Sequence, residues 1–343
     1  MKTRNMQIEG LRGLAILSIL VFHVFYRYQQ IYVSSEVKYS WMKDWGNFGV
    51  CIFLLISCYY LINFNSDTTS FSLINYLLKK IIRLWPLYAI AITITAIVIH
   101  IFPLPERMST WIDWLLNLTF INGFLGTSYV DGAHWYLTIL ISFFVISGIG
   151  KKFKIEKEPL FYFGIIALYL LSVILHIENI VKGGRYCFIF CFACTLRWFV
   201  QKKSSSISKE MLLWIFLGGI SLFGIFRFIG MGYFIIICII TPCFLGCALG
   251  KWKFMQNKLF VFMGSISYSL YLIHQNIAYE AEYYLVKILG EWHALIGLAG
   301  LLVGAGAGLI LYFFAERPTT FAKNKRSDSK NMERGNKTAY KKT

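Results

Sequence analysis

Long apolar stretches recur along this chain of 343 residues, and they constrain its fold more than any other feature of the sequence. An α-helix needs about 20 apolar residues to cross the hydrocarbon core of a bilayer. Because that core offers no water, each span must satisfy its backbone hydrogen bonds within its own helix. We therefore predict an all-α, polytopic transmembrane helical bundle of about 10 helices. The predicted spans are residues 11–28, 48–62, 82–102, 135–150, 160–177, 186–200, 211–223, 231–250, 260–279 and 294–315.

Two further observations bear on this fold class. Apolar residues make up 57% of the chain, above the roughly 45–50% that is usual in soluble domains. A soluble fold cannot cover that much apolar surface. The stretch 111–125 is amphiphilic rather than uniformly apolar, and it predicts a re-entrant or interfacial segment.

Basic residues outnumber acidic ones by 34 to 17, and they form one cluster in each predicted inner loop. Cytoplasmic loops carry the excess of Lys and Arg in membrane proteins, so the N- and C-termini are both predicted to be cytoplasmic. No nucleic-acid partner is predicted, because such a partner requires positive charge gathered on one face. Residues 319–343 are rich in basic and polar residues and nearly free of apolar ones. They predict a basic, disordered cytoplasmic tail near anionic membrane lipid.

The eight cysteines all lie inside apolar spans. A bound metal requires Cys, His or carboxylate ligands at close spacing, and neither His nor carboxylate accompanies these cysteines at such a spacing. Cysteine is also an ordinary small residue at contacts between helices. We predict packing positions for the cysteines and no metal.

Two ionisable residues, Arg12 and His23, lie within the first predicted span, apart from Arg27 at its outer end. A charged side chain at the bilayer centre costs about 2.5–3.5 kcal/mol on insertion scales, so such residues face the protein interior and often mark function. A separation of eleven positions at ~100° per residue places both on one helix face, ~16 Å apart along the axis. The alternative is that Arg12 extends to the inner headgroups and that His23 makes a buried hydrogen bond to another helix.

The sequence that carries these two residues resembles the membrane-bound acyltransferase 3 family, the polysaccharide O-acetyltransferases. The mark of that family is an Arg followed, after ten intervening residues, by a His, as in IEGLRGLAILSILVFHVF. Similar motifs follow in order: GNFGVCIFLLISCYYL (46–61), KKIIRLWPLY (79–88), AHWYL (133–137), SYSLYLIH (267–274) and AERP (315–318). The resemblance implies an acyltransferase 3-like membrane domain over residues 1–318, multi-pass in the bacterial inner (plasma) membrane.

The resemblance also implies a reaction, the transfer of an acetyl group from acetyl-CoA to a hydroxyl of a glycan or lipid-linked glycan. An alcohol is a poor nucleophile at neutral pH and needs a base, for which His23 is the candidate. Arg12 is the second candidate catalytic residue, either orienting the donor or stabilising negative charge on the thioester oxygen. The chain has no fused esterase-like domain and no Glu one turn after Trp135. These departures favour a modifier of O-antigen, capsule or exopolysaccharide over one of peptidoglycan.

Six more residues are candidates for binding. Lys79, Lys80 and Arg83 are predicted to hold the phosphates of the donor, although inside-positive orientation explains them equally well. Lys80 stands where many relatives have Arg. The predicted substrate-pocket residues are Trp135, which is suited to stack on a sugar ring, and Ser267 and His274, which share one helix face. The alternative for Trp135 is a place in the aromatic belt at the membrane interface, and the alternative for Ser267 and His274 is helix packing.

The alternative function is a multi-helix transporter or flippase of a glycan precursor or small solute, in which the buried Arg and His form a relay. Transporters of this kind show inverted repeats and matching Gly or Pro breaks in their two halves. The sequence shows neither feature, and the acyltransferase hypothesis is therefore preferred. The sequence predicts no oligomeric state.

Overall fold

The computed structural model describes residues 5–33, 37–65, 71–178, 183–202, 208–290 and 292–318. Helices account for all the regular secondary structure within these ranges, which confirms the all-α prediction for the described part of the chain. The predicted tail, residues 319–343, lies outside the described residues. The prediction of one membrane domain over residues 1–318 stays a prediction.

The first helix is composite. α1 (Met6–Val21) continues as the π-helical turn η1 (Phe22–Arg27) and then as α2 (Tyr28–Tyr32). The remaining α-helices, in chain order, are α3 (Trp45–Tyr59), α4 (Leu73–Ile101), α5 (Trp111–Leu118), α6 (Asn122–Leu125), α7 (Trp135–Lys152), α8 (Pro159–Ile174), α9 (Cys187–Gln201), α10 (Lys209–Gly224), α11 (Met231–Ala248), α12 (Lys258–Ser265), α13 (Ser267–Leu289) and α14 (His293–Leu311).

Six helical segments in the described ranges are long and apolar enough to cross a membrane: Met6–Tyr32, Leu73–Ile101, Gly132–Lys152, Lys209–Ile229, Met231–Ala248 and His293–Glu316. The four other predicted spans are also helical, but α3, α8 and α9 are short and α13 carries many polar residues. Large apolar side chains are exposed along α4 and α14, as expected of surfaces that face lipid. A multi-pass membrane fold follows, while the predicted count of about 10 and the sides of the termini stay predictions.

The predicted span 260–279 is in fact two helices. The chain breaks at Ile266, where α12 ends and α13 begins, and the Ser267 hydroxyl bonds back to the Gly264 carbonyl at 2.8 Å. α13 then runs on to Leu289, well beyond the predicted end. Its polar residues, among them Asn276 and Glu282, are buried against other helices, so a boundary drawn from the apolar run alone ends too early.

Glycines bring α12 very close to α1. A Cβ atom on Gly13 would lie 1.9 Å from the Phe260 carbonyl oxygen, and one on Gly264 would lie 1.8 Å from the Glu9 carbonyl oxygen. Only a residue without a side chain permits this backbone approach, which is the usual role of small residues where membrane helices cross. The contact holds the first half of α1 in place.

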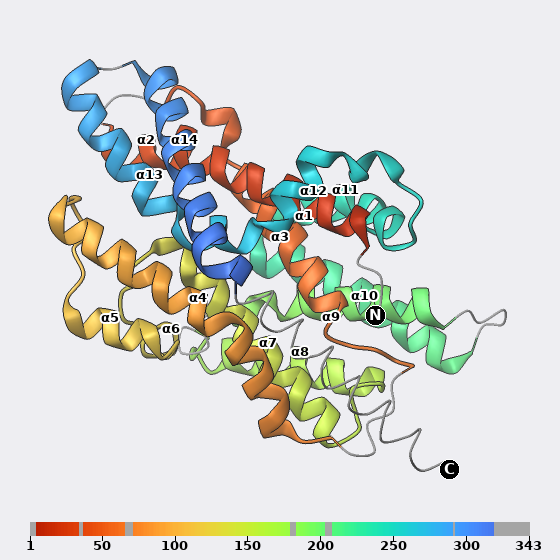
Figure 1. The fold of residues 1–343 in the computed structure, drawn as a ribbon. Coiled ribbons are helices and arrows are strands. Elements are labelled where there is room, and N and C mark those ends of the chain that lie inside the picture. Colours follow the sequence, from red (N-terminus) through yellow and green to blue (C-terminus); the bar gives the residue numbers. More distant parts are fainter. Residues whose placement is uncertain are drawn as a thin grey trace, which may run out of the picture.

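Figure 1 shows α1 between the α13–α14 pair on one side and α11 and α12 on the other. α1 also packs against α3, where Gly49 lies against the Ala15 carbonyl and the Ile19 side chain. α13 contacts α14, α4 and α1. The seam between α1 and α13 is therefore enclosed by other helices.

Candidate active site

The seam between α1 and α13 brings together four of the eight residues that the sequence singled out. At one end, Arg12 Nη2 donates to the Ser267 hydroxyl at 3.0 Å. At the other end, the His23 ring meets the His274 ring edge to face, with ring centroids 5.1 Å apart. The predicted face of α1 and the predicted face of α13 are thus in contact, and the two helices run in the same direction.

His23 lies in the π-helical turn η1. Single π turns insert one extra residue into a helix and are frequent at functional sites. The ring is held by Tyr279, whose hydroxyl is 2.9 Å from His23 Nδ1. An imidazole has two nitrogens with separate roles, so a partner on Nδ1 leaves Nε2 to act on another group.

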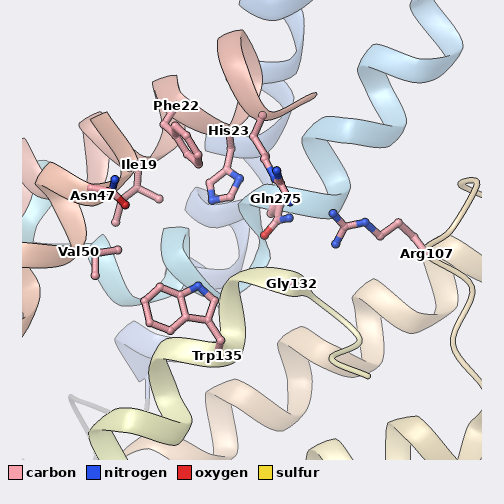
Figure 2. A pocket seen from close by; sticks show the side chains of 11 residues that line it. Ile19, Phe22, His23, Asn47, Val50, Arg107, Gly132, Trp135 and Gln275 are labelled. Carbon is pink, nitrogen blue, oxygen red and sulfur yellow. The ribbon is translucent and has the colours of Figure 1, made fainter. Parts of the chain in front are cut away.

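A cavity of about 330 Å³ opens beside His23. Three polar residues on its wall come from distant parts of the chain: Arg27 from η1, Arg107 from the segment between α4 and α5, and Gln275 from α13. Figure 2 shows His23, Trp135, Gln275 and Arg107 around the same space. Of the predicted substrate-pocket residues, only Trp135 lines this cavity.

The wall of the cavity opposite His23 is fixed by a buried carboxylate. Asp131 accepts from the backbone N–H groups of Ala133, at 2.9 Å, and of Asn276, at 3.3 Å. The Asn276 side chain donates to the Val130 carbonyl at 2.7 Å. These bonds tie the turn before α7 to α13, and they position Trp135 relative to His23.

Arg12 occupies a separate site near the start of α1. In addition to its bond to Ser267, its guanidinium lies 3.6 Å from the Glu9 carboxylate. It is not part of the wall of the cavity beside His23. Its side chain is 25% exposed, so the group is held in one orientation without being sealed from the surface. His274, by contrast, is fully buried, packs against the His23 ring and is not part of the cavity wall.

The predicted donor-binding residues lie at the start of α4, away from the His23 cavity. Lys79 and Arg83 are exposed, and Lys80 is half-buried. Lys80 Nζ lies 5.4 Å from the centroid of the Tyr76 ring, and Lys151 Nζ lies 4.8 Å from the same centroid. Lys151 also donates to the Leu61 carbonyl at 2.6 Å. The structure thus adds a second half-buried cation, from α7, to the predicted cluster.

Four residues of this site escaped the sequence reasoning: Arg27, Arg107, Gln275 and Tyr279. Each arginine by itself is ordinary in a loop or at a helix end of a membrane protein, and nothing in the sequence pairs the two. Tyr279 meets His23 across 256 positions of chain. Within α13 the signal was present, because Gln275 follows His274 directly and is itself 3% exposed in an apolar setting.

One of the comparisons with known proteins finds a match. The model of a family described as "Acyltransferase domain" matches residues 5–315, a range that contains every α-helix from α1 to α14. No curated protein matches the chain, and no solved structure matches it either.

Proposed function

The chain belongs to the acyltransferase 3 family, and from this membership we propose that it transfers an acetyl group from acetyl-CoA to a hydroxyl of a cell-surface glycan in the bacterial inner membrane. Membership makes the protein an acyltransferase; the donor, the acceptor and the location are the proposal. The observation that carries it is the geometry of His23, a histidine held by a tyrosine hydroxyl on the wall of a 330 Å³ cavity.

His23 acts as the general base in this proposal. When Nδ1–H donates to the Tyr279 oxygen, the Nε2 lone pair is available to accept the proton of the acceptor hydroxyl. The hydroxyl oxygen then attacks the thioester carbonyl, and the carbon–sulfur bond breaks. His23 returns the proton to the departing thiolate. The products are an acetyl ester and CoA, and the imidazole is neutral again.

Arg12 orients the donor in this scheme. Two roles are open to its fixed positive charge: orientation of the donor and stabilisation of negative charge on the thioester oxygen. Eleven positions of helix separate it from His23, about 16 Å along the axis. A group stabilising the reacting oxygen must lie within hydrogen-bond distance of it, so the separation favours the first role. The bond to Ser267 keeps the guanidinium pointing along the seam.

The phosphates of acetyl-CoA are assigned to the basic cluster at the start of α4. Lys80 and Lys151 approach one aromatic ring, Tyr76, from two helices. Two like charges held this close repel each other, and a bound anion relieves the repulsion. Arg83 lies one turn beyond Lys80 on the same helix and provides a bidentate donor. This arrangement supports a polyanionic donor that enters from the predicted cytoplasmic side.

The acceptor is assigned to the cavity beside His23. Trp135 offers an aromatic face of the kind that packs against sugar rings, and Asn47 and Gln275 offer amide groups. A glycan still attached to its lipid carrier is the acceptor form best suited to a site inside a membrane protein.

Glycan mass spectrometry tests the proposal in cells. A bacterial strain that produces this protein should carry surface glycans with acetyl esters that alkali removes, and a strain producing His23→Ala at equal membrane levels should lack them. Absence of acetyl esters from the glycans of both strains, with both proteins in the membrane, would exclude surface glycans as the acceptor, and acetyl esters in both strains would exclude His23 as the base.

A further inference from the structure

Two arginines face the same cavity as His23. Arg27 follows it by four positions in η1, and Arg107 reaches in from the segment between α4 and α5. The Arg107 guanidinium lies 5.7 Å from the centroid of the Tyr279 ring, the same tyrosine that holds His23. The proposed acyl transfer uses neither arginine, and two positive charges beside a neutral base call for an explanation.

Neither arginine is neutralised within the described part of the chain. No carboxylate oxygen there lies within 4.0 Å of either guanidinium. Arg27 donates to the Gln30 amide oxygen, a neutral acceptor. Asp131, next to the cavity residue Gly132, accepts from two backbone N–H groups. Arg107 forms a side-chain hydrogen bond with Tyr32, a neutral partner, and Glu106 and Glu280 lie near the same tyrosine.

A buried amide points to a ligand at the same place. Gln275 is 3% exposed, lines the cavity, and has an Oε1 atom with no hydrogen-bond partner among the described residues. Buried amide groups are nearly always paired, with protein or with ordered water, so this oxygen on a cavity wall is available to a water or to a bound hydroxyl. Its Nε2 group lies on the same side as Arg107 and has the chemistry to donate to an oxyanion there, while Oε1 accepts from a hydroxyl.

Because Gly132 has no side chain, the ends of the Arg107 and Gln275 side chains can come together beside it. A Cβ atom on Gly132 would lie 2.7 Å from Arg107 Nη1 and 3.1 Å from Gln275 Nε2. Both neighbours are the far ends of flexible side chains, so an added methyl group would displace them rather than the backbone. The guanidinium and the amide therefore converge over a position without a side chain, as Figure 2 shows.

We propose that the acceptor is an anionic glycan, and that Arg107, assisted by Arg27, binds an oxyanion carried by the acceptor. Paired guanidinium and amide donors suit a carboxylate or a phosphate, and Arg binds both in bidentate fashion. Trp135 then packs against the sugar ring, and the acceptor hydroxyl comes to His23. The inference rests on the proposed function and specifies its substrate class.

The position of the arginines assigns the anion to the acceptor rather than to CoA. Arg27 and Arg107 lie beyond His23, at the end of the seam opposite Arg12. The phosphates of the donor are assigned to the far end, near Lys80. Two anion sites on opposite sides of the reacting hydroxyl fit two anionic substrates that enter from opposite ends.

The test compares three acceptors with the full-length protein in liposomes and labelled acetyl-CoA. They are a disaccharide that contains glucuronate, the same disaccharide with its carboxyl group reduced to an alcohol, and a neutral sugar on a prenyl diphosphate. We expect the glucuronate or the diphosphate acceptor to have a KM at least about tenfold below that of the reduced disaccharide, since one charge-assisted contact contributes about this factor. Which of the two is preferred distinguishes carboxylate from phosphate.

Two variants connect this preference to the site. Arg107→Gln should raise the KM of the preferred anionic acceptor about tenfold and leave the reduced disaccharide nearly unchanged. Gly132→Ala keeps every charge but displaces the Arg107 guanidinium. It should likewise raise the KM of the preferred anionic acceptor relative to the KM of the reduced disaccharide. The control is Arg227→Gln, which removes an exposed arginine of η5 (Ile225–Ile229) outside the cavity.

Equal KM values for the charged and reduced acceptors in the wild type would overturn the inference. So would a ratio of these two KM values that Arg107→Gln does not alter. Neither outcome would contradict the proposed acyl transfer. Direct titration of the protein with the glucuronate disaccharide separates the two proposals. Binding that Arg107→Gln abolishes, in a protein that transfers no acetyl group to any acceptor, would retain the anion site and reject the proposed function. Absence of both binding and transfer would reject both.

Discussion

His23 owes its orientation to residues at the other end of the chain. Tyr279 bonds its Nδ1 atom at 2.9 Å, and the His274 ring packs against its edge. A free imidazole exchanges its proton between two nitrogens, so a base that must keep Nε2 unprotonated needs a partner on Nδ1. The hydroxyl of Tyr279 provides that partner without introducing a charge.

Tyr279→Phe should lower the turnover number for acetyl transfer about tenfold while the KM for acetyl-CoA stays within about twofold, because the lost bond orients the base and does not touch the donor. Steady-state kinetics in liposomes measures both constants. Tyr283→Phe, one turn along the same helix, is the matched control. A rise in KM with unchanged turnover would assign Tyr279 to substrate binding instead.

The sequence identified some of these residues and missed their partners for a physical reason. Arg12 and His23 stand out because ionisable groups are expensive in an apolar span. Tyrosine carries no such cost, and an arginine near a helix end is ordinary in a membrane protein. Tyr279 and Arg107 become visible only when α13 and the segment between α4 and α5 are brought beside α1.

Among the elements, α1 depends on glycine for its place. Gly13 lies directly against the Phe260 carbonyl, so any side chain there forces α12 away and moves the start of the α1–α13 seam. The apolar run of the sequence predicts this helix. The sequence does not predict that α1 crosses α12, because a glycine in an apolar run does not indicate which helix packs against it.

Gly13→Ala should destabilise the protein by about 1–3 kcal/mol, the usual cost of overpacking a closely packed contact. Thermal unfolding in detergent, followed by tryptophan fluorescence, measures the change. Gly219→Ala on α10 is the control, since a Cβ atom there meets no atom within 4 Å. Equal unfolding temperatures for the two variants would show that the close approach of α1 and α12 does not limit stability.

α4 presents its basic residues away from the His23 cavity, and this separation carries a kinetic prediction. Lys80→Ala and Arg83→Ala should raise the KM for acetyl-CoA about tenfold and lower turnover little, since contacts with remote phosphates strengthen binding of ground state and transition state alike. Initial rates at varied acetyl-CoA measure this. Lys251→Ala, an exposed lysine in a different predicted inner loop, is the control. A pure loss of turnover would remove the cluster from donor binding.

At the scale of the whole molecule, the sequence predicted the class of fold and not its arrangement. Serial apolar runs dictate transmembrane helices, and the described helices agree with that. Which helices are neighbours depends on packing between distant segments. α13 illustrates the limit, because its buried Asn276 and Glu282 lower its hydropathy while its contacts with α14, α4 and α1 place it inside the bundle. Hydropathy indicates which segments can contact lipid, but it does not indicate which helices contact one another.

The proposed base, His23, lies between Arg12, the proposed donor-orienting residue at the start of the seam, and the proposed acceptor cavity at its end. Acetyl transfer from labelled acetyl-CoA by the purified protein in liposomes, wild type against His23→Ala, tests this most directly. His100→Ala, an exposed histidine on α4, serves as the control. Loss of a general base costs about 10²–10⁴-fold in rate, so we predict that much less transfer by His23→Ala, with acetyl-CoA binding retained. Transfer by His23→Ala at the wild-type rate would contradict the account.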